Sequence, residues 1–224
     1  MAEIMNNENN DTFFSFKIVI IGCSNVGKTE ILNSYVNKNY VFENDTKTTI
    51  GISYVKIKKK YDNFVNFQIW DTAGEERYRS IIKNYFKKSK GALIVYDITN
   101  EQSFNQLDYW FDELKSQTDA EIILVGNKLD LSGERKIAYN AGKDKAKLYN
   151  ASFFEVSAKK RENINEVFDT LFEKVYQNYK NEFIDDKNSD ELSLDETSLD
   201  NQSFNNPSFR LDTNTTNTSY EICC

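Results

Sequence analysis

The feature that most constrains this chain is a loop with a glycine at each end, placed between an apolar stretch and a helical pattern. Residues 16–21 carry one charge among six positions, which is typical of a buried strand. The loop occupies residues 22–29, and an amphipathic helical pattern continues through residues 30–35. This order predicts the first strand, loop and helix of a parallel α/β sheet.

The loop fits the pattern G-x-x-x-x-G-K-[ST] in the context that the pattern requires. Gly22 permits a sharp turn, Gly27 permits close approach of a ligand, and the helix N-terminus supplies unpaired amides. Lys28 is expected at the terminal phosphates of a nucleotide, and the Thr29 hydroxyl on a Mg²⁺ ion. The alternative is a chance glycine-lysine loop. The residues expected to contact the nucleotide here are Ser24, Asn25, Val26, Gly27, Lys28, Thr29 and Glu30.

Composition bounds the remaining possibilities. A chain of 224 residues with 39% hydrophobic content can form one ordinary domain. It has no histidine and three cysteines, which excludes histidine acid-base chemistry and a disulfide framework. Most of the net charge of -7 lies in residues 181–224, which hold ten acidic and two basic residues. The body is nearly neutral, so no basic face for nucleic acid is expected.

Strand and helix patterns alternate along the rest of the chain, which favours helices on both faces of a mainly parallel sheet. We expect a P-loop NTPase fold with six strands, including one antiparallel edge strand from a hairpin at residues 50–70. Residues 1–13 are expected to be a flexible extension, 14–180 the domain, and 181–224 a disordered tail. The other expected strands are 16–21, 91–96, 121–125 and 152–156, and the expected helices are 27–37, 103–117, 139–149 and 163–179.

Asp71 follows the strand at residues 64–70, and it is followed by Thr-Ala-Gly at 72–74. A carboxylate there is placed to hold Mg²⁺ beside a phosphate loop, although it could instead cap a following helix. The Gly74 amide can reach a γ-phosphate, and a glycine lets its loop move. Such a loop predicts a switch whose conformation depends on the terminal phosphate.

The motif expected to select the base of the nucleotide is N-K-x-D, formed by Asn127, Lys128 and Asp130 after the strand at 121–125. The Asp130 carboxylate can accept hydrogen bonds from N1 and the exocyclic amine of guanine, which adenine cannot donate. Lys128 is expected along the ring face. An aspartate-capped turn is the alternative. The run Ser157, Ala158 and Lys159 follows the last strand and supplies a backbone amide for the guanine carbonyl.

Together these motifs resemble the Ras superfamily of small GTPases, and within it the Rab family. The Rab-like segments are residues 50–54, 67–70, 77–80, 96–99 and the last two cysteines. The resemblance implies a GTPase that converts GTP and water to GDP and phosphate with Mg²⁺. It implies Thr29, Thr49 and Asp71 at the metal, and Phe42 packed edge-on to the guanine. Phe42 could instead anchor its loop to the core.

The resemblance also implies an effector surface, formed by Ile50, Tyr54, Trp70 and Tyr85, although each aromatic could be a half-buried structural residue. It places Glu75 with Lys28 and Gly74 at the catalytic centre, where the family normally has glutamine for Glu75. A carboxylate keeps an acceptor for water but loses a donor and adds charge, so altered turnover is expected. A GTP-locked membrane scaffold is therefore the alternative function. A P-loop kinase would need an arginine-bearing lid, which is not apparent.

The tail ends in Cys223 and Cys224, which resemble the Rab signal for two geranylgeranyl groups. The family resemblance implies a role in vesicle and membrane traffic, at the cytoplasmic face of an intracellular membrane with a cytosolic pool. It also implies effectors, an exchange factor, a GTPase-activating protein, Rab escort protein and GDP-dissociation inhibitor as partners. A monomer that binds no nucleic acid is expected.

Overall fold

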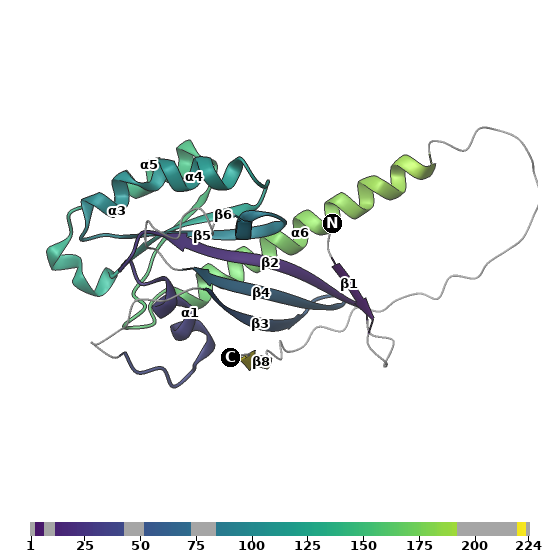
Figure 1. Ribbon diagram of the computed structural model, residues 1–224, viewed down its shortest axis with the longest axis horizontal. Helices are drawn as coiled ribbons and strands as arrows, with labels where there is room; N and C mark the ends of the chain where they lie inside the picture. The colour runs from purple at the N-terminus through teal and green to yellow at the C-terminus, as the bar shows by residue number, and fades with distance from the viewer. Residues whose placement is uncertain (1–2, 7–11, 43–51, 73–83, 192–218, 223–224) are drawn as a thin grey trace, which may run out of the picture.

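The computed structural model describes residues 3–6, 12–42, 52–72, 84–191 and 219–222, and side chains within 14–42, 53–72 and 84–182. A single twisted sheet runs through the molecule, with helices on both faces (Figure 1). Its strands are β1 (Glu3–Asn6), β2 (Thr12–Gly22), β3 (Ile52–Lys60), β4 (Phe64–Thr72), β5 (Ser89–Asp97), β6 (Glu121–Asn127), β7 (Ser152–Glu155) and β8 (Ser219–Ile222). The helices are α1 (Lys28–Val36), α3 (Glu101–Asn105), α4 (Leu107–Lys115), α5 (Tyr139–Leu148) and α6 (Ile164–Glu191), with a 3₁₀ segment η2 (Leu129–Glu134).

The strand order is β7-β6-β5-β2-β4-β3-β8, with β1 paired to β2. Strands β2, β4, β5, β6 and β7 are parallel, while β3 runs antiparallel to β4. This confirms the predicted fold class and the predicted hairpin. Because the parallel strands share one direction, their carboxyl ends lie at one edge of the sheet, where ligands bind in open α/β folds.

Alternation along β2 explains why the sheet is covered on both sides. Ile18 and Ile20 pack into one core with α1 and α6, whereas Val19 and Ile21 pack into a second core with α4 and α5. Figure 1 shows α3, α4 and α5 on one side of the sheet and α1 on the other. Both faces of the sheet are therefore buried, so the carboxyl edge is the part of the sheet that remains available to bind a ligand.

The structure departs from the sequence prediction in three ways. The expected helix at 103–117 is two helices, α3 and α4, which meet at Gln106 with φ −89° and ψ 1°. Helix α6 continues past residue 180 to Glu191, because residues 164–191 contain neither glycine nor proline. The structure also adds β1 and β8, in segments for which no regular structure was expected.

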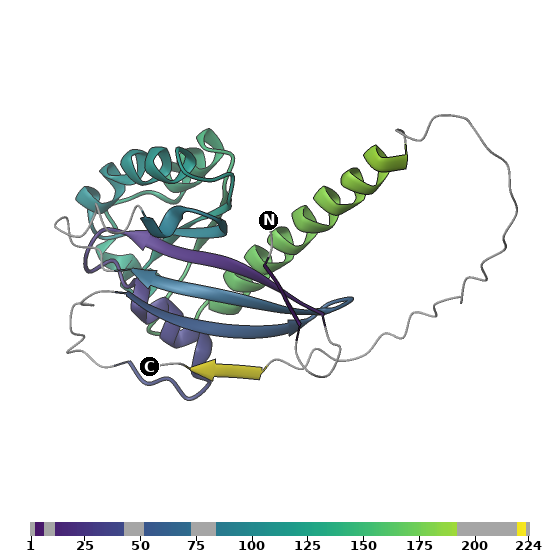
Figure 2. The ribbon, with the colours of Figure 1, turned by 45° about the vertical axis from the view of Figure 1, so that its right-hand side comes forward.

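Strand β8 pairs antiparallel with β3, in a register that sets Val55 opposite Ile222. Figure 2 shows β8 beside β3 and α6 projecting beyond the sheet. Strand β3 was expected to be the edge strand of the sheet, but β8 lies beyond it. Within the described residues, no helix is both long and apolar enough to cross a membrane.

Candidate functional site

The phosphate loop joins β2 to α1, and both of its glycines are required by the backbone. Gly22 has φ 143°, and a Cβ there would lie 2.2 Å from the carbonyl oxygen of Val95. Gly27 has φ 90°, and a Cβ there would lie 2.4 Å from Nδ2 of Asn127. Side chains at these positions would displace the loop from β5 and β6, so the glycines fix its closeness to the sheet.

Lys28 begins α1, and its side chain folds back into the loop. Its Nζ donates to the carbonyl oxygens of Gly22 at 3.0 Å and Cys23 at 2.7 Å. The residue is 6% exposed, and burial lowers the pKa of Lys28 to about 8, against the opposing effect of the Asp71 charge. The loop thus holds a desolvated ammonium group, which a phosphate can stabilise by direct contact.

Thr29 and Asp71 meet at the base of the loop. The Thr29 hydroxyl donates to Oδ2 of Asp71 at 2.6 Å, and Asp71 is fully buried. Burial raises the pKa of Asp71, while the Thr29 hydrogen bond and Lys28 act to lower it. Oδ1 of Asp71 has no hydrogen-bond partner among the described residues. A buried carboxylate oxygen beside a hydroxyl fits Mg²⁺, which takes few protein ligands and completes its shell with phosphates and water.

A cavity of about 380 Å³ opens beside the loop. Asp130, on η2, lies in its wall, and the Ser157 hydroxyl donates to Oδ1 of Asp130 at 2.6 Å. This contact orients the carboxylate from the last loop of the domain. The lining residues are Asn25, Gly27, Glu30, Phe42, Asn127, Lys128, Asp130, Leu131, Ala158 and Lys159. Sequence reasoning had selected all of these except Leu131, which follows the N-K-x-D motif by one position.

Asn127 joins three walls of this cavity. Its Nδ2 donates to the carbonyl oxygen of Val26 in the phosphate loop at 2.9 Å. Its Oδ1 accepts from the backbone N–H of Ala158 at 3.2 Å. The side chain is buried at the end of β6, so both amide groups are used to hold neighbouring loops in place. These two hydrogen bonds assign Asn127 a positioning role within the pocket.

Comparison with known proteins agrees with this geometry. The family model described as Ras family matches residues 17–177. Ras-related protein Rab-3 of Caenorhabditis elegans is 41% identical over 163 residues, covering 71% of this chain and 74% of that protein. Ras-related protein RGP2 of Oryza sativa subsp. japonica is 40% identical over 166 residues, covering 73% and 76%. Ras-related protein RABA2d of Arabidopsis thaliana is 39% identical over 169 residues, covering 74% and 77%.

This chain belongs to the Ras family, as a Rab-type small GTPase. It hydrolyses GTP, and the Rab resemblance drawn from its motifs is confirmed. The phosphate loop, the Thr29–Asp71 contact and the cavity at Asp130 lie at the carboxyl edge of the sheet, where the sequence predicts the nucleotide.

The structure also places beside these residues one that the sequence prediction does not assign to the site. Asp97 ends β5 and forms an ion pair with Lys128, with Nζ 2.6 Å from Oδ2. Lys128 has a left-handed backbone with φ 72°, and Asp97 also accepts from N and Oγ1 of Thr99. The register of β5 and β6 sets Asp97 beside Asn127. That shared position at two parallel strand ends was the available signal.

We expect Asp97→Asn to raise the rate of GDP release about tenfold, because it removes the charge that holds Lys128 along the cavity wall. The Asn side chain keeps an acceptor for Thr99, so the fold of the loop should persist. Release of a fluorescent GDP analogue measures the effect, with the exposed Asp144→Asn as the matched control. An unchanged release rate would show that Lys128 holds its position without Asp97.

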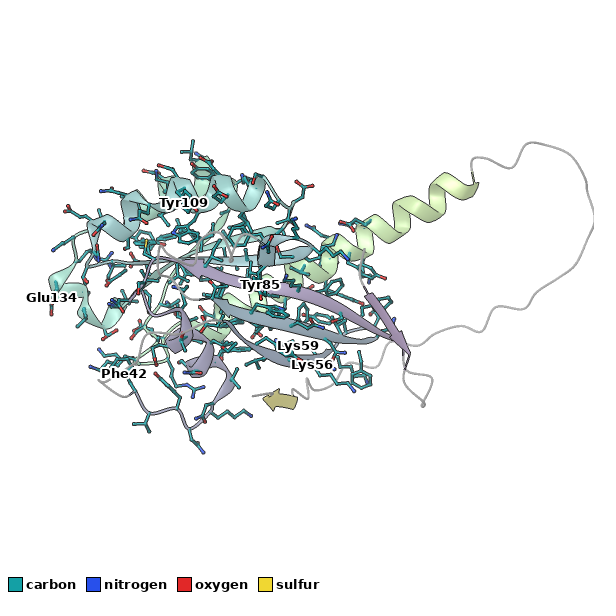
Figure 3. The ribbon with its side chains drawn as sticks, in the orientation of Figure 1. Phe42, Lys56, Lys59, Tyr85, Tyr109 and Glu134 are labelled. Carbon is teal, nitrogen blue, oxygen red and sulfur yellow. The ribbon has the colours of Figure 1, made fainter. Side chains whose placement is uncertain are left out.

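The predicted base-stacking residue Phe42 lines the cavity, with the Lys159 ammonium 5.2 Å from its ring centroid. Figure 3 labels Phe42 on the same side of the molecule as Glu134. The other predicted site residues Thr49, Ile50, Gly74, Glu75, Cys223 and Cys224 lie outside the described residues.

The aromatic residues predicted to meet effectors lie together on β3, β4 and the segment before β5. Tyr54 stacks on Trp70 at 5.1 Å between ring centroids, and Trp70 contacts Tyr85 at 5.5 Å. The Lys17 ammonium lies over both Trp70 and Tyr85, at 5.3 and 5.4 Å. All are half-buried, so the cluster is continuous and still presents aromatic surface.

Proposed function

We propose that this GTPase is a nucleotide-dependent switch in membrane traffic that recruits effectors in its GTP state. The observation that carries the proposal is the convergence of Lys28, the Thr29–Asp71 pair and Asp130 on one site at the carboxyl edge of the sheet. A phosphate cradle, a magnesium-binding pair and a guanine acceptor are the three components that such a switch needs.

Each group has a separate task. Lys28 faces the terminal phosphates, and Asp130 accepts hydrogen bonds from the guanine. Thr29 and Asp71, joined by Thr49, would hold Mg²⁺, which when bound neutralises charge on the phosphates. Loss of the γ-phosphate would release Thr49 and Gly74, and this coupling makes the state of the nucleotide visible to effectors. We propose that effectors recognise that state by contacting the surface formed by Tyr54, Trp70 and Tyr85.

The proposal is tested with purified protein and fluorescent nucleotides. We expect tight binding of GDP and GTP in the presence of Mg²⁺, weaker binding when EDTA is added, and little binding of ATP. Hydrolysis is followed by phosphate release in a single turnover. Failure to bind either guanine nucleotide, or a preference for ATP, would contradict the proposed function.

The buried ammonium of Lys28 predicts a pH dependence of binding. Its pKa is lowered to about 8 without nucleotide, and an adjacent phosphate must raise it. Binding above about pH 8 therefore takes up a proton, and the affinity for GDP should fall by about tenfold for each pH unit. Titrations of wild type and Lys28→Met from about pH 7 to about pH 9 measure this. Parallel profiles would contradict it, since both proteins share any titration of the nucleotide.

Glu75 provides a test of turnover. Glu75→Gln restores an amide donor and removes a negative charge beside the reacting phosphate, and removing one such donor in other enzymes costs about 2.7 to 4 kcal/mol. We expect the variant to hydrolyse GTP at least about tenfold faster in a single turnover. Glu76→Gln is the control for the charge change alone. Equal rates would show that glutamate positions water as well as glutamine does, and a negligible wild-type rate would favour the GTP-locked scaffold.

We also propose that Cys223 and Cys224 carry two geranylgeranyl groups. Two lipid chains suffice for stable anchoring where one is marginal, and the acidic tail offers no basic cluster to assist. The expected location is the cytoplasmic face of an intracellular membrane, with a cytosolic pool that Rab escort protein and GDP-dissociation inhibitor would bind. An exchange factor and a GTPase-activating protein would set the cycle. Imaging a tagged chain beside one with both cysteines changed to serine tests the anchor.

A further inference from the structure

Glu30 places a carboxylate in the wall of the nucleotide cavity. It follows Thr29 in the first turn of α1, and it lines the cavity together with Phe42 and Asp130. The N-terminus of α1 is the end of the helix that attracts anions. A bound diphosphate would lie at that same positive end of the helix. The Glu30 carboxylate and the phosphates would then be like charges close to one another.

The Glu30 side chain is held in place by the segment that follows α1. The Tyr40 hydroxyl donates to Oε2 of Glu30, and the Tyr40 backbone N–H donates to the carbonyl oxygen of Asn37 at 3.0 Å. Tyr40 is half-buried and precedes Phe42 by two residues. A tyrosine hydroxyl is a neutral donor, so this contact fixes the carboxylate without removing its charge.

We propose that Glu30 is a determinant of nucleotide residence time that acts against binding. In the protein without nucleotide, its charge stabilises the N-terminus of α1. When GDP or GTP is bound, the same charge repels the phosphates across a partly desolvated site, where like charges interact more strongly than in water. Both effects favour release, so Glu30 makes the GTPase exchange nucleotide faster than its pocket otherwise would.

A second role for the Glu30–Tyr40 contact, in positioning the base, would instead slow nucleotide release. Through Tyr40, Glu30 also ties the start of α1 to the segment that carries Phe42, and this contact would help to hold the base. Glu30→Gln separates the two roles, because its amide oxygen still accepts from Tyr40 while its charge is gone. If charge repulsion dominates, release slows; if positioning dominates, release is unchanged or faster.

The test is the dissociation rate of a fluorescent GDP analogue from the full chain with Mg²⁺ present. We expect Glu30→Gln to lengthen the residence time roughly fivefold or more at low salt, and the difference from wild type to shrink as salt screens the repulsion. Glu134→Gln is the matched control, because Glu134 is exposed on η2 (Figure 3) and its replacement removes the same charge outside the cavity wall. It should leave the residence time unchanged.

An unchanged or shorter residence time in Glu30→Gln would overturn the inference, as would an equal lengthening in Glu134→Gln. Tyr40→Phe supplies a second measurement, since it removes the hydrogen bond but keeps the carboxylate, and it should not lengthen residence. The inference rests on the proposed nucleotide site, and the two fail separately. A wild-type chain that does not bind GDP contradicts the site, whereas binding with no charge effect contradicts only the role of Glu30.

Discussion

Replacing Asp130 with asparagine is expected to change the base preference of the protein from guanine to xanthine. In the proposed site, guanine would present two donors, N1–H and the exocyclic amine, to the Asp130 carboxylate, and asparagine would set its own amide donor against one of them. Xanthine carries an oxygen at the position of that amine, so an asparagine amide can donate to it. We expect GDP to bind at least about 100-fold more weakly and xanthosine diphosphate to become the preferred ligand.

Competition between the two diphosphates for a fluorescent analogue measures this preference. The control is Asp144→Asn, which makes the same chemical change at an exposed position on α5. Ser157 donates to Oδ1 of Asp130 at 2.6 Å, and asparagine retains an oxygen for that contact, so the loop should keep its place. A variant that loses GDP without gaining xanthosine diphosphate would show that Asp130 supports the loop rather than reading the base.

Removing the charge of Lys28 should weaken both nucleotides without unfolding the protein. In Lys28→Met the ammonium that we propose faces the phosphates is lost, and truncating one member of a buried charge pair costs about 2 to 5 kcal/mol. We expect GDP and GTP to bind about 100-fold more weakly or worse. Methionine keeps an unbranched apolar chain in the buried position, although the carbonyls of Gly22 and Cys23 lose their donor.

Equilibrium titration measures the affinity, and the thermal unfolding midpoint without nucleotide measures the fold. Lys38→Ala, at an exposed position after α1 and outside the cavity lining, is the control for loss of a positive charge. Affinity within a few-fold of wild type would show that backbone amides alone bind the phosphates. A large fall in the unfolding midpoint would instead assign Lys28 to the structure of the loop.

The fold and the parts of the site with local motifs could be predicted from sequence. Residues 18–21 alternate between two cores, and the apolar run that results is typical of a strand buried on both faces. The phosphate loop carries its own geometric requirements in Gly22 and Gly27, so pattern and structure coincide there. Asp130 and Ser157 were each found by their place after a strand, and the structure joins them.

The features that could not be predicted from sequence depend mainly on contacts between elements that are distant along the chain. The position of Asp97 at a strand end is visible in the sequence, but its ion pair with Lys128 needs the register of β5 beside β6, which neither segment encodes alone. The break at Gln106 falls within a continuous helical pattern. Helix α6 runs beyond its predicted end because residues 164–191 contain neither glycine nor proline, although the composition becomes polar after residue 180.

Asn127 has a consequence for how the nucleotide leaves. One buried amide holds the phosphate loop through Val26 and the last loop through Ala158, so these two walls are mechanically coupled. Displacing either one strains the hydrogen bond to the other. A regulator that displaces one segment at the outside of the domain would therefore weaken the contacts to base and phosphate together. The nucleotide should then dissociate in one concerted step.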